Sequence, residues 1–298
     1  MARSVLVTGG EGQIGRELQR LSWPSGLVAV FPGRDRLDLC NPESIAEYVA
    51  GTDWGCIVNC AAWTAVDAAE DAVAEAFRVN AQGPALLAEA AARARIPFVQ
   101  LSTDYVFDGR LDRPYREDDP VCPRNAYGAS KLAGELAVRA AHPRAVVLRT
   151  AWVLSVHRTN FLKTMLRLAD TRKQLSVVAD QVGCPTSASD IAKAIRQICQ
   201  RLIDDPSAPC GIYHFAGAGS ASWHELACAI FDDAALQGRR VPEVNPIETQ
   251  DYPTRAARPA NSRLETSRIT QDFGIVPRPW RDAVRDIVDE LQTQEQPA

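Results

Sequence analysis

Residues 8–15 are Thr8-Gly9-Gly10-Glu11-Gly12-Gln13-Ile14-Gly15, and they lie between a short apolar run and an amphipathic segment. Three of these glycines have the spacing G-x-x-G-x-x-G. A glycine triplet that follows a strand and opens a helix is typical of a dinucleotide-binding fold, and an ordinary flexible turn is the alternative. In the dinucleotide-binding interpretation, Gly9 permits the sharp turn, Gly12 lets the backbone approach the pyrophosphate, and Gly15 lets the helix pack on the strand. The helix N-terminus would then face the phosphates with free amide groups.

Short runs rich in valine and isoleucine alternate with longer alanine-rich segments. This alternation predicts an α/β fold with a doubly wound parallel sheet of the Rossmann type. Strands covered on both faces have continuous apolar sequences, and we expect them at Ser4–Val7, Leu27–Phe31, Cys56–Asn59, Phe98–Ser102, Val146–Arg149, Leu175–Val178 and Gly211–Phe215. We expect helices at Ile14–Leu21, Pro42–Val49, Ala72–Asn80, Pro84–Ala94, Tyr127–Ala141, Phe161–Ala169, Asp190–Arg201 and Trp223–Ala235.

The regular alternation weakens after about Thr150. We therefore expect a dinucleotide-binding domain over residues 1–150 and a smaller, mainly substrate-binding lobe over residues 151–298. The later strand-like runs Leu175–Val178 and Gly211–Phe215 are expected to return to the large sheet. The proline-rich stretch from Val241 to Pro259 is typical of an ordered loop.

The bulk properties exclude several classes of protein. The 298 residues carry a formal net charge of -4 with both signs interspersed, so we expect neither a nucleic-acid partner nor a membrane surface. Apolar runs fall short of the roughly 18 residues that a membrane helix requires, and the N-terminus has no targeting pattern. These features predict a cytoplasmic protein.

The eight cysteines and four histidines are scattered, without the close pairs that metal ligation uses. We expect the cysteines to be buried, reduced thiols, because free cysteine packs as a small apolar group.

The residues that follow the second expected strand bear on the choice of cofactor. An acidic side chain there binds the ribose 2′-hydroxyl of NAD, whereas an arginine accommodates the 2′-phosphate of NADP. This chain has both, in Arg34, Asp35 and Asp38. NADPH and NADH therefore both remain open.

A second chemical pattern is Tyr127-Gly128-Ala129-Ser130-Lys131, in which tyrosine and lysine lie one helical turn apart. A nearby ammonium group is expected to lower the pKa of the phenol toward the working range, so that tyrosine can protonate a carbonyl oxygen as hydride reaches its carbon. Thr103 ends an expected strand, where ligands bind in open α/β sheets, and its hydroxyl can donate to the same oxygen. An exposed helix that carries both residues by chance is the alternative. The order of glycine loop, strand-end hydroxyl and Y-x-x-x-K is that of a short-chain dehydrogenase.

Two longer motifs resemble the dTDP-4-dehydrorhamnose reductase family, namely Ser102-Thr103-Asp104-Tyr105-Val106-Phe107-Asp108-Gly109 and Tyr127-Gly128-Ala129-Ser130-Lys131-Leu132-Ala133-Gly134-Glu135. Further matches are Asn59-Cys60-Ala61-Ala62, Val79-Asn80-Ala81, Arg149-Thr150-Ala151-Trp152-Val153, Asp180-Gln181-Val182-Gly183-Cys184-Pro185-Thr186 and Arg258-Pro259-Ala260-Asn261-Ser262-Arg263-Leu264. The resemblance covers nearly the whole chain, and the later motifs are the narrower ones.

The resemblance implies roles for particular residues. Thr103, Tyr127 and Lys131 would form the catalytic group, and Thr103, Tyr127 and Trp152 would contact a dTDP-linked deoxysugar. The cofactor would be lined by Gly9, Gly12, Gln13, Ile14, Gly15, Asp38, Leu39, Ala61, Ala62 and Lys131. The implied reaction reduces the C4 ketone of dTDP-4-dehydro-L-rhamnose to dTDP-L-rhamnose. Trp152 is expected to offer the sugar a flat apolar wall, with a core tryptophan as the alternative.

The sequence departs from the family pattern beside the expected pocket. Trp63 stands where the family more often has tyrosine or histidine, and Ala68 replaces a frequent lysine, so a related 4-ketosugar is open as substrate. In some family members magnesium bridges a homodimer through carboxylates. Glu17 matches one such position, and the other ligands are unassigned.

Two other functions compete with the reductase. An epimerase or dehydratase of the same superfamily would share the glycine loop, Tyr127 and Lys131, but dehydratases place an acid where this chain has Tyr105. A regulatory subunit resembling that of methionine adenosyltransferase would need no catalytic group, and the presence of Thr103, Tyr127 and Lys131 argues against it.

Overall fold

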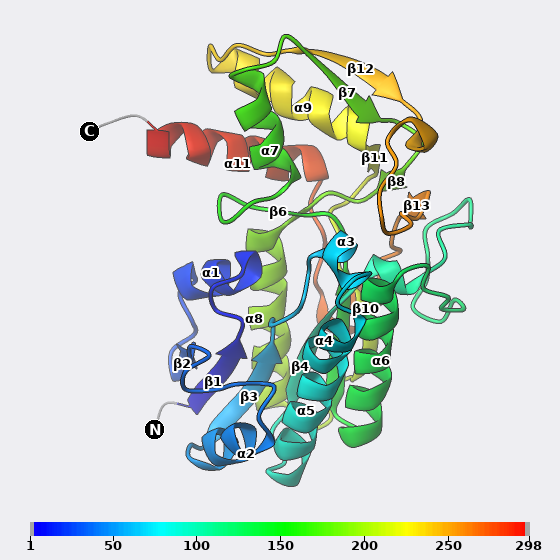
Figure 1. Cartoon of the computed structure of the whole chain (residues 1–298). Helices are drawn as coiled ribbons and strands as arrows, with labels where there is room; N and C mark the ends of the chain where they lie inside the picture. The colour runs from blue at the N-terminus through cyan, green and yellow to red at the C-terminus, as the bar shows by residue number, and fades with distance from the viewer. Residues whose placement is uncertain (1–2, 296–298) are drawn as a thin grey trace.

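The computed structural model describes residues 3–295, which form a large lobe and a smaller one above it (Figure 1). The large lobe is built on one six-stranded sheet with the order β2-β1-β3-β4-β5-β10, and every neighbouring pair is parallel. Its strands are β1 (Arg3–Thr8), β2 (Leu27–Val30), β3 (Trp54–Asn59), β4 (Phe98–Thr103), β5 (Ala145–Thr150) and β10 (Gly211–His214). The predicted α/β class and parallel sheet are confirmed.

Helices cover both faces of this sheet. One face packs against α1 (Gln13–Arg20), α8 (Ala188–Asp204) and α10 (Ser267–Phe273). The other packs against α2 (Pro42–Ala50), α5 (Gly83–Arg93) and α6 (Ala126–Ala141). Because β4 and β5 are buried at every position, their sequences lack the polar alternation of a half-exposed strand.

The strand order reverses beside β1, which has β2 on one side and β3 on the other. Such a reversal opens a crevice outside the carboxyl ends of the two inner strands. These ends face the smaller lobe in Figure 1. The glycine loop follows β1, so it lies at this crevice.

The smaller lobe has its own hydrophobic core, formed by three helices and a two-stranded sheet. The elements are α7 (Phe161–Ala169), α9 (Trp223–Leu236), α11 (Trp280–Glu295), β7 (Gln174–Val178) and β12 (Glu243–Ile247). Short strands join the lobes, with β8 (Val182–Gly183) between β11 (Ala221–Ser222) and β13 (Asn261–Ser262), and β6 (Val153–Leu154) beside β9 (Thr186–Ser187). The chain therefore crosses between the lobes several times after residue 150.

Three predictions about this region need correction. Of the two later runs, β10 joins the large sheet as expected, but the strand at Leu175–Val178 pairs with β12 instead. The stretch 241–259 is not wholly loop, because it contains β12, where Pro246 is tolerated in a short two-stranded sheet. Helix α11 was not expected, although Val284, Ile287, Val288 and Leu291 bury one side of it at helical spacing.

The expected helix Ala72–Asn80 is also divided. It consists of α4 (Val73–Phe77) followed by a π-helical turn, η1 (Arg78–Gln82), which continues directly into α5. Two helices have side-chain N-caps: Asn41 accepts from the Glu43 and Ser44 amides at the start of α2, and Ser222 forms a capping box with Glu225 at the start of α9.

The expectation for the cysteines holds only in part. All eight are free, and Cys56, Cys184 and Cys199 are buried, but Cys122 is exposed.

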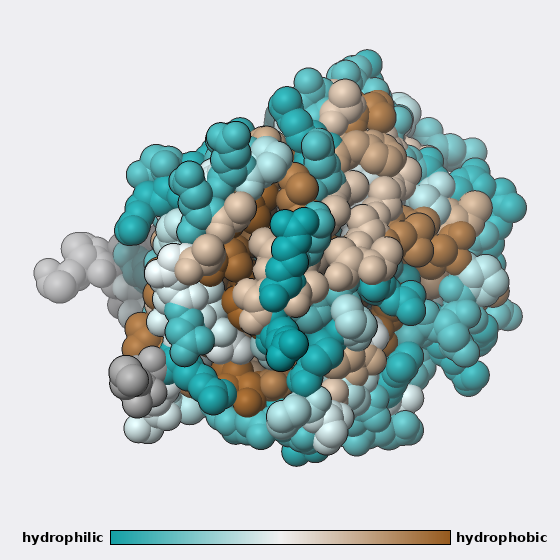
Figure 2. All heavy atoms as spheres, turned by 90° about the horizontal axis from the view of Figure 1, so that it is seen from below, coloured by the Kyte–Doolittle hydropathy of each residue, from teal (hydrophilic) through white to brown (hydrophobic). Residues whose placement is uncertain are grey.

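Within residues 3–295, no helix is long and apolar enough to cross a bilayer. Seen from below, the face farthest from the smaller lobe has apolar residues near its centre and hydrophilic residues around them (Figure 2).

Candidate active site

The glycine loop makes a close approach to the segment that follows β3. Gly9 has a φ of +71°, and a Cβ there would lie 2.5 Å from the Ala61 amide nitrogen. A Cβ on Gly15 would collide with the Gly9 carbonyl oxygen and lie 2.7 Å from the Gly10 Cα. Gly12 is the N-cap of α1 and has no side chain to occupy the free amides. Gly9 therefore permits the sharp turn as predicted, whereas the close approach at Gly15 is to Gly9 and Gly10 of the loop rather than to the strand.

The start of α1 is also tied to the smaller lobe. Gln13 Oε1 accepts hydrogen bonds from Ser155 Oγ at 2.8 Å and Asn160 Nδ2 at 2.9 Å. Ile14 packs against the core beneath the sheet. Gln13 thus fixes the position of the β6–α7 segment relative to the glycine loop.

The segment after β2 contains the expected cofactor residues Asp38 and Leu39. Asp38 Oδ1 accepts from the Cys40 amide at 2.9 Å and lies 3.5 Å from Arg34 Nε. Leu39 is buried against Gly83, where a Cβ would lie 2.8 Å from the Leu39 carbonyl oxygen. Arg34 projects into solvent with 78% of its side chain exposed, so its guanidinium is accessible to an anion.

Buried amide side chains hold the loop after β3. Asn59 Oδ1 accepts from Thr8 Oγ1 at 2.5 Å and from the Ala61 amide at 3.1 Å. Asn80 accepts from the Trp63 amide at 2.8 Å and donates to Ser130 Oγ at 3.0 Å. The sequence motifs contained both asparagines but gave them no role. The sequence signal for such a role was that Asn59 ends an expected strand and Asn80 ends an expected helix, each beside small residues.

Helix α6 presents one face to this crevice. Asn125 caps it by accepting from the Gly128 amide at 2.7 Å. Gly128 and Gly134 let it approach its neighbours, since a Cβ on Gly128 would collide with the Tyr105 carbonyl oxygen and one on Gly134 with the Asn80 carbonyl oxygen. The glycines in the motif around Y-x-x-x-K are thus required by packing.

Thr103, Tyr127 and Lys131 come together as the sequence predicted. Thr103 Oγ1 donates to Asp104 Oδ1 at 2.9 Å and accepts from the Tyr105 amide at 3.2 Å. Tyr127 lies close enough to Thr103 for the threonine hydroxyl to favour the phenolate form. The two hydroxyl groups therefore lie together at the end of β4.

The pKa of Tyr127 is shifted in the direction opposite to the one that the sequence predicted. Burial raises the pKa of Tyr127 above its ordinary value, and the nearby Thr103 hydroxyl opposes this effect only in part. Lys131 Nζ donates to the Leu101 carbonyl oxygen at 2.7 Å, while burial lowers the lysine pKa to about 8. The predicted lowering of the Tyr127 pKa by the ammonium is not found, because burial dominates and Lys131 is not among the groups that shift this pKa.

Two further side chains complete the walls of the crevice. Burial raises the pKa of Asp104 to about 6, against the opposing effect of the nearby Ser262 and Thr103 hydroxyls. The Tyr105 ring meets Tyr127 edge-on, with centroids 5.5 Å apart. Sequence reasoning used Tyr105 only to argue against a dehydratase and gave Asp104 no role.

Trp152 lies in a stack of aromatic rings rather than alone. It has a φ of +47° and rests on Trp223, with ring centroids 3.5 Å apart and planes 6° apart. A Cβ on Gly183 would lie 2.6 Å from Trp152 Nε1 and 2.7 Å from Cζ2. Because Trp223 already covers one face of the indole, Gly183 closes on it from the other side. The edge of the ring, not its face, is left for a ligand.

The two departures from the family pattern lie beside α3 (Val66–Ala69). Trp63 donates through Nε1 to the Ala65 carbonyl oxygen at 3.1 Å and packs in one cluster with Tyr127. Ala68 is in α3 itself, next to Asp67, which pairs with Arg258 Nη2 at 2.6 Å.

Glu17 is engaged by basic side chains. Its Oε1 lies 3.3 Å from His157 Nε2 and 3.5 Å from Arg20 Nη1, and burial raises the pKa of the carboxyl group. In the described part of the chain, no group of three or more His, Cys, Asp and Glu side chains could hold a metal ion. The structure of the single chain therefore does not support magnesium.

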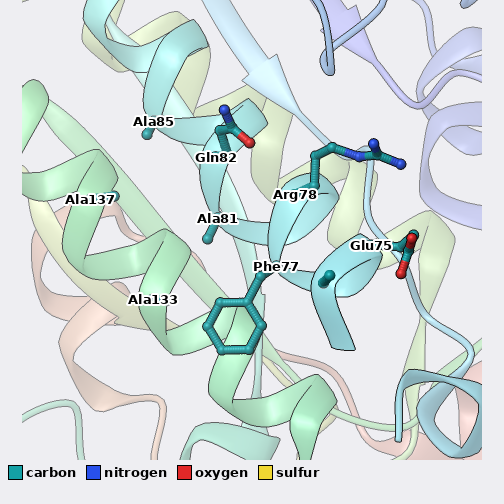
Figure 3. Close-up of a pocket in the computed structure, with 9 residues that line it drawn as sticks. Glu75, Phe77, Arg78, Ala81, Gln82, Ala85, Ala133 and Ala137 are labelled. Atoms are coloured by element: carbon teal, nitrogen blue, oxygen red, sulfur yellow. The ribbon is translucent and has the colours of Figure 1, made fainter. Parts of the chain in front are cut away.

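A groove on the outer side of α6 is separate from this site. It lies between α6 and the α4–η1–α5 segment, and Phe77 points toward α6 near Ala133 (Figure 3). Ala133 and Ala137 face this groove, whereas Tyr127 and Lys131 are buried on the inner side of the helix. None of the predicted site residues lines it.

Comparison with known proteins agrees with this geometry. A family model described as the RmlD substrate binding domain matches residues 3–293. The dTDP-4-dehydrorhamnose reductase of Aggregatibacter actinomycetemcomitans is 43% identical over 290 residues, which cover 96% of this chain and 98% of that protein. The chain belongs to the dTDP-4-dehydrorhamnose reductase family. Another relative of that name, from Sinorhizobium fredii, is 44% identical over 286 residues, or 95% of each chain.

Solved structures of the family have the same fold. A dTDP-4-dehydrorhamnose reductase from Bacillus anthracis in complex with NADP is 34% identical, has a TM-score of 0.90 and is matched over 97% of this chain and 100% of that one. Its counterpart from Clostridium acetobutylicum has a TM-score of 0.90 at 35% identity, over 97% and 99% of the two chains. DesIV, a dTDP-glucose 4,6-dehydratase from Streptomyces venezuelae, is 20% identical with a TM-score of 0.77, which shows a common fold alone.

Proposed function

We propose that this chain is a dTDP-4-dehydrorhamnose reductase, which uses NADPH or NADH to reduce the C4 ketone of dTDP-4-dehydro-L-rhamnose to dTDP-L-rhamnose. One observation carries the proposal most directly. Tyr127 lies beside Thr103 at the carboxyl ends of the strands, on the same face of α6 as Lys131 and at the same edge of the sheet as the glycine loop. Relatives at 43–44% identity over nearly the whole chain have this name, which supports the same assignment.

The charge states suit the reductive direction. A group that protonates a developing oxyanion must hold its proton until hydride arrives, and burial keeps Tyr127 neutral. The phenol then donates this proton to the ketone oxygen. Lys131 stabilises the phenolate that forms, because an ammonium group favours a nearby anion. Thr103 would turn its hydroxyl proton from Asp104 to the ketone oxygen and hold that oxygen in line with Tyr127.

The nicotinamide cofactor supplies the hydride when bound. The backbone at Gly9, Gly12 and Gly15, with the first turn of α1, would hold its pyrophosphate. Gln13, Ile14, Asp38, Leu39, Ala61, Ala62 and Lys131 complete the proposed set. Both cofactors are proposed to bind, because Arg34 is accessible to a 2′-phosphate and Asp38 lies beside it for a free hydroxyl.

The deoxysugar is proposed to lie between Thr103, Tyr127 and the edge of Trp152. The stack of Trp152 on Trp223 makes that edge part of a rigid apolar wall. Trp63, in place of the family's usual residue, packs in one cluster with Tyr127, so a related dTDP-linked 4-ketosugar is the alternative substrate. We also propose that the protein is a homodimer and is located in the cytoplasm. We do not propose a bound metal ion.

The test is direct. The purified chain is incubated with dTDP-4-dehydrorhamnose and each reduced cofactor, and the sugar product is identified. Stoichiometric consumption of NADPH or NADH with formation of dTDP-L-rhamnose is the expected result. Turnover without net consumption of cofactor would instead indicate an epimerase or dehydratase. No turnover on any ketosugar nucleotide, with copurification of a synthetase, would indicate a regulatory subunit.

A further inference from the structure

Helix α6 carries three ionisable side chains in a row on its buried face. Tyr127, Lys131 and Glu135 are each one turn apart, and Lys131 and Glu135 are 4% and 1% exposed. Glu135 does not touch the proposed reaction centre, since Lys131 stands between it and Tyr127. Its place in the row calls for an explanation, because a buried carboxylate is costly unless it is paired.

Glu135 pairs with a residue on β5, the strand that follows α6 in the chain. Arg149, on β5, donates through Nε at 2.9 Å and Nη2 at 2.7 Å to the two carboxylate oxygens of Glu135. Arg149 is itself 1% exposed, lies with its guanidinium carbon 5.0 Å from the Phe107 ring centroid, and also donates to the Glu117 carbonyl oxygen. This two-bond geometry fixes the carboxylate and prevents it from turning away from Lys131.

The lysine has few other partners. Its Nζ donates to the Leu101 carbonyl oxygen of β4, and the remaining titratable groups that act on it are Glu135 and the buried thiol of Cys60, which follows β3. Burial lowers the lysine pKa to about 8, and Glu135 is the first group that opposes this effect. Lys131 is also one of only four lysines, with Lys163, Lys173 and Lys193, among 33 basic residues.

We propose that Glu135, held in place by Arg149, is a positioning residue of the reaction whose carboxylate keeps Lys131 charged beside Tyr127. The effect of Glu135 on catalysis rests on the proposed function, whereas its effect on the charge of Lys131 does not. A neutral lysine would not stabilise the phenolate, so the pair acts on the reaction through Lys131. Arg149 has the opposite electrostatic effect on the lysine, because its positive charge partly offsets that of the carboxylate.

Glu135 and Arg149 carry opposite charges, so removal of each should shift the Lys131 midpoint in opposite directions. This test does not need the substrate. With ¹³C-labelled lysine, four Cε signals can be followed by NMR as pH rises, and Lys131 is assigned by its loss in Lys131→Arg. We expect Glu135→Gln to lower the Lys131 midpoint by at least about one pH unit and Arg149→Met to raise it. The double variant should lie between them. Glu89→Gln, which removes the exposed Glu89–Arg93 pair on α5, is the matched control and should change nothing.

Loss of packing alone would move the Glu135→Gln and Arg149→Met midpoints in the same direction. That result, or a Glu135→Gln midpoint within about 0.3 pH units of the wild type, overturns the proposal. If Glu135→Gln does not fold, the comparison of Arg149→Met with the double variant decides, since the double variant leaves no unpaired charge.

Activity then separates this inference from the proposed function. Relative to the wild type, Glu135→Gln should lose at least about fivefold in turnover near pH 8 and less than about threefold near pH 6, because its lysine is still charged at the lower pH. If the NMR midpoints follow the expected order but the wild type reduces no ketosugar nucleotide, the proposed function is wrong and the electrostatic role of Glu135 stands. If reduction occurs but the midpoints do not move, this inference alone is wrong.

Discussion

Trp152 lies flat on Trp223, with ring centroids 3.5 Å apart, although the two residues are 71 positions apart in the sequence (223 minus 152). Trp223 is the first residue of α9 and donates through Nε1 to Gln181 at 3.2 Å. The positive φ of Trp152 is unusual for a residue with a large side chain and persists because its ring is held on both faces. The stack makes this tryptophan both a part of the core and a candidate wall of the substrate pocket.

Gly183→Ala tests that arrangement, because the added methyl group would occupy the place of the Trp152 ring. We expect weaker binding of the sugar nucleotide, unchanged cofactor affinity, and a loss of about 1–3 kcal/mol of stability from overpacking. Calorimetric titration and thermal unfolding measure the three quantities. Gly51→Ala, where the nearest atom to the new Cβ is 3.3 Å away at the end of α2, is the control. Unaltered sugar-nucleotide affinity in Gly183→Ala would remove Trp152 from the pocket.

Tyr127→Phe keeps the ring and removes only the hydroxyl. Loss of the proton donor should lower turnover by about 10²–10⁴-fold, while the affinity for NADPH stays the same because the glycine loop is untouched. Single-turnover kinetics with the ketosugar and fluorescence titration with NADPH give the two values. A variant that retained more than about a tenth of wild-type turnover, with chemistry rate-limiting, would show that another group protonates the ketone.

Activity should fall as pH rises through about 8, where Lys131 loses its proton. Tyr127 stays protonated across this range, because burial raises its pKa. The loss is not a result of unfolding. Since the folded pKa of Lys131 is below its ordinary value of 10.5, the unfolded chain binds more protons above pH 8, and this group's contribution to the free energy of unfolding rises with pH. A pH profile of kcat/KM beside thermal midpoints at the same pH values separates the two effects. Parallel losses would contradict the assignment to Lys131.

Arg34→Ala should weaken NADPH binding and leave NADH binding nearly unchanged, because only NADPH has the 2′-phosphate that an arginine can meet. In the wild type, we expect the two affinities to differ by less than about a hundredfold, or 2.7 kcal/mol. Titration of both cofactors into both proteins measures the four constants. Arg36, whose guanidinium carbon lies 5.9 Å from the Tyr48 ring centroid, provides the comparison variant Arg36→Ala. Equal losses for NADH and NADPH in Arg34→Ala would place the 2′-phosphate elsewhere.

The sequence by itself determined the features that depend on local order. Continuous apolar runs predicted all six strands of the large sheet, and Gly9, Gly12 and Gly15 predicted the loop after β1. The four-residue spacing of Tyr127 and Lys131 put them on one face of α6. These predictions succeeded because periodicity, glycine geometry and helix capping are decided by residues close together in the chain.

Only the tertiary structure decided the features that depend on distant partners. The apolar run of β7 looks like that of a central strand, and its pairing with β12 is chosen by the packing of the smaller lobe. The bonds between Glu135 and Arg149 and the stack of Trp152 on Trp223 likewise join residues from different elements. The tertiary structure also decided the protonation states of buried side chains. Burial raises the pKa of Tyr127, whereas the sequence predicted that the neighbouring lysine would lower it. Desolvation depends on everything packed around a group, and no local stretch of sequence contains that information.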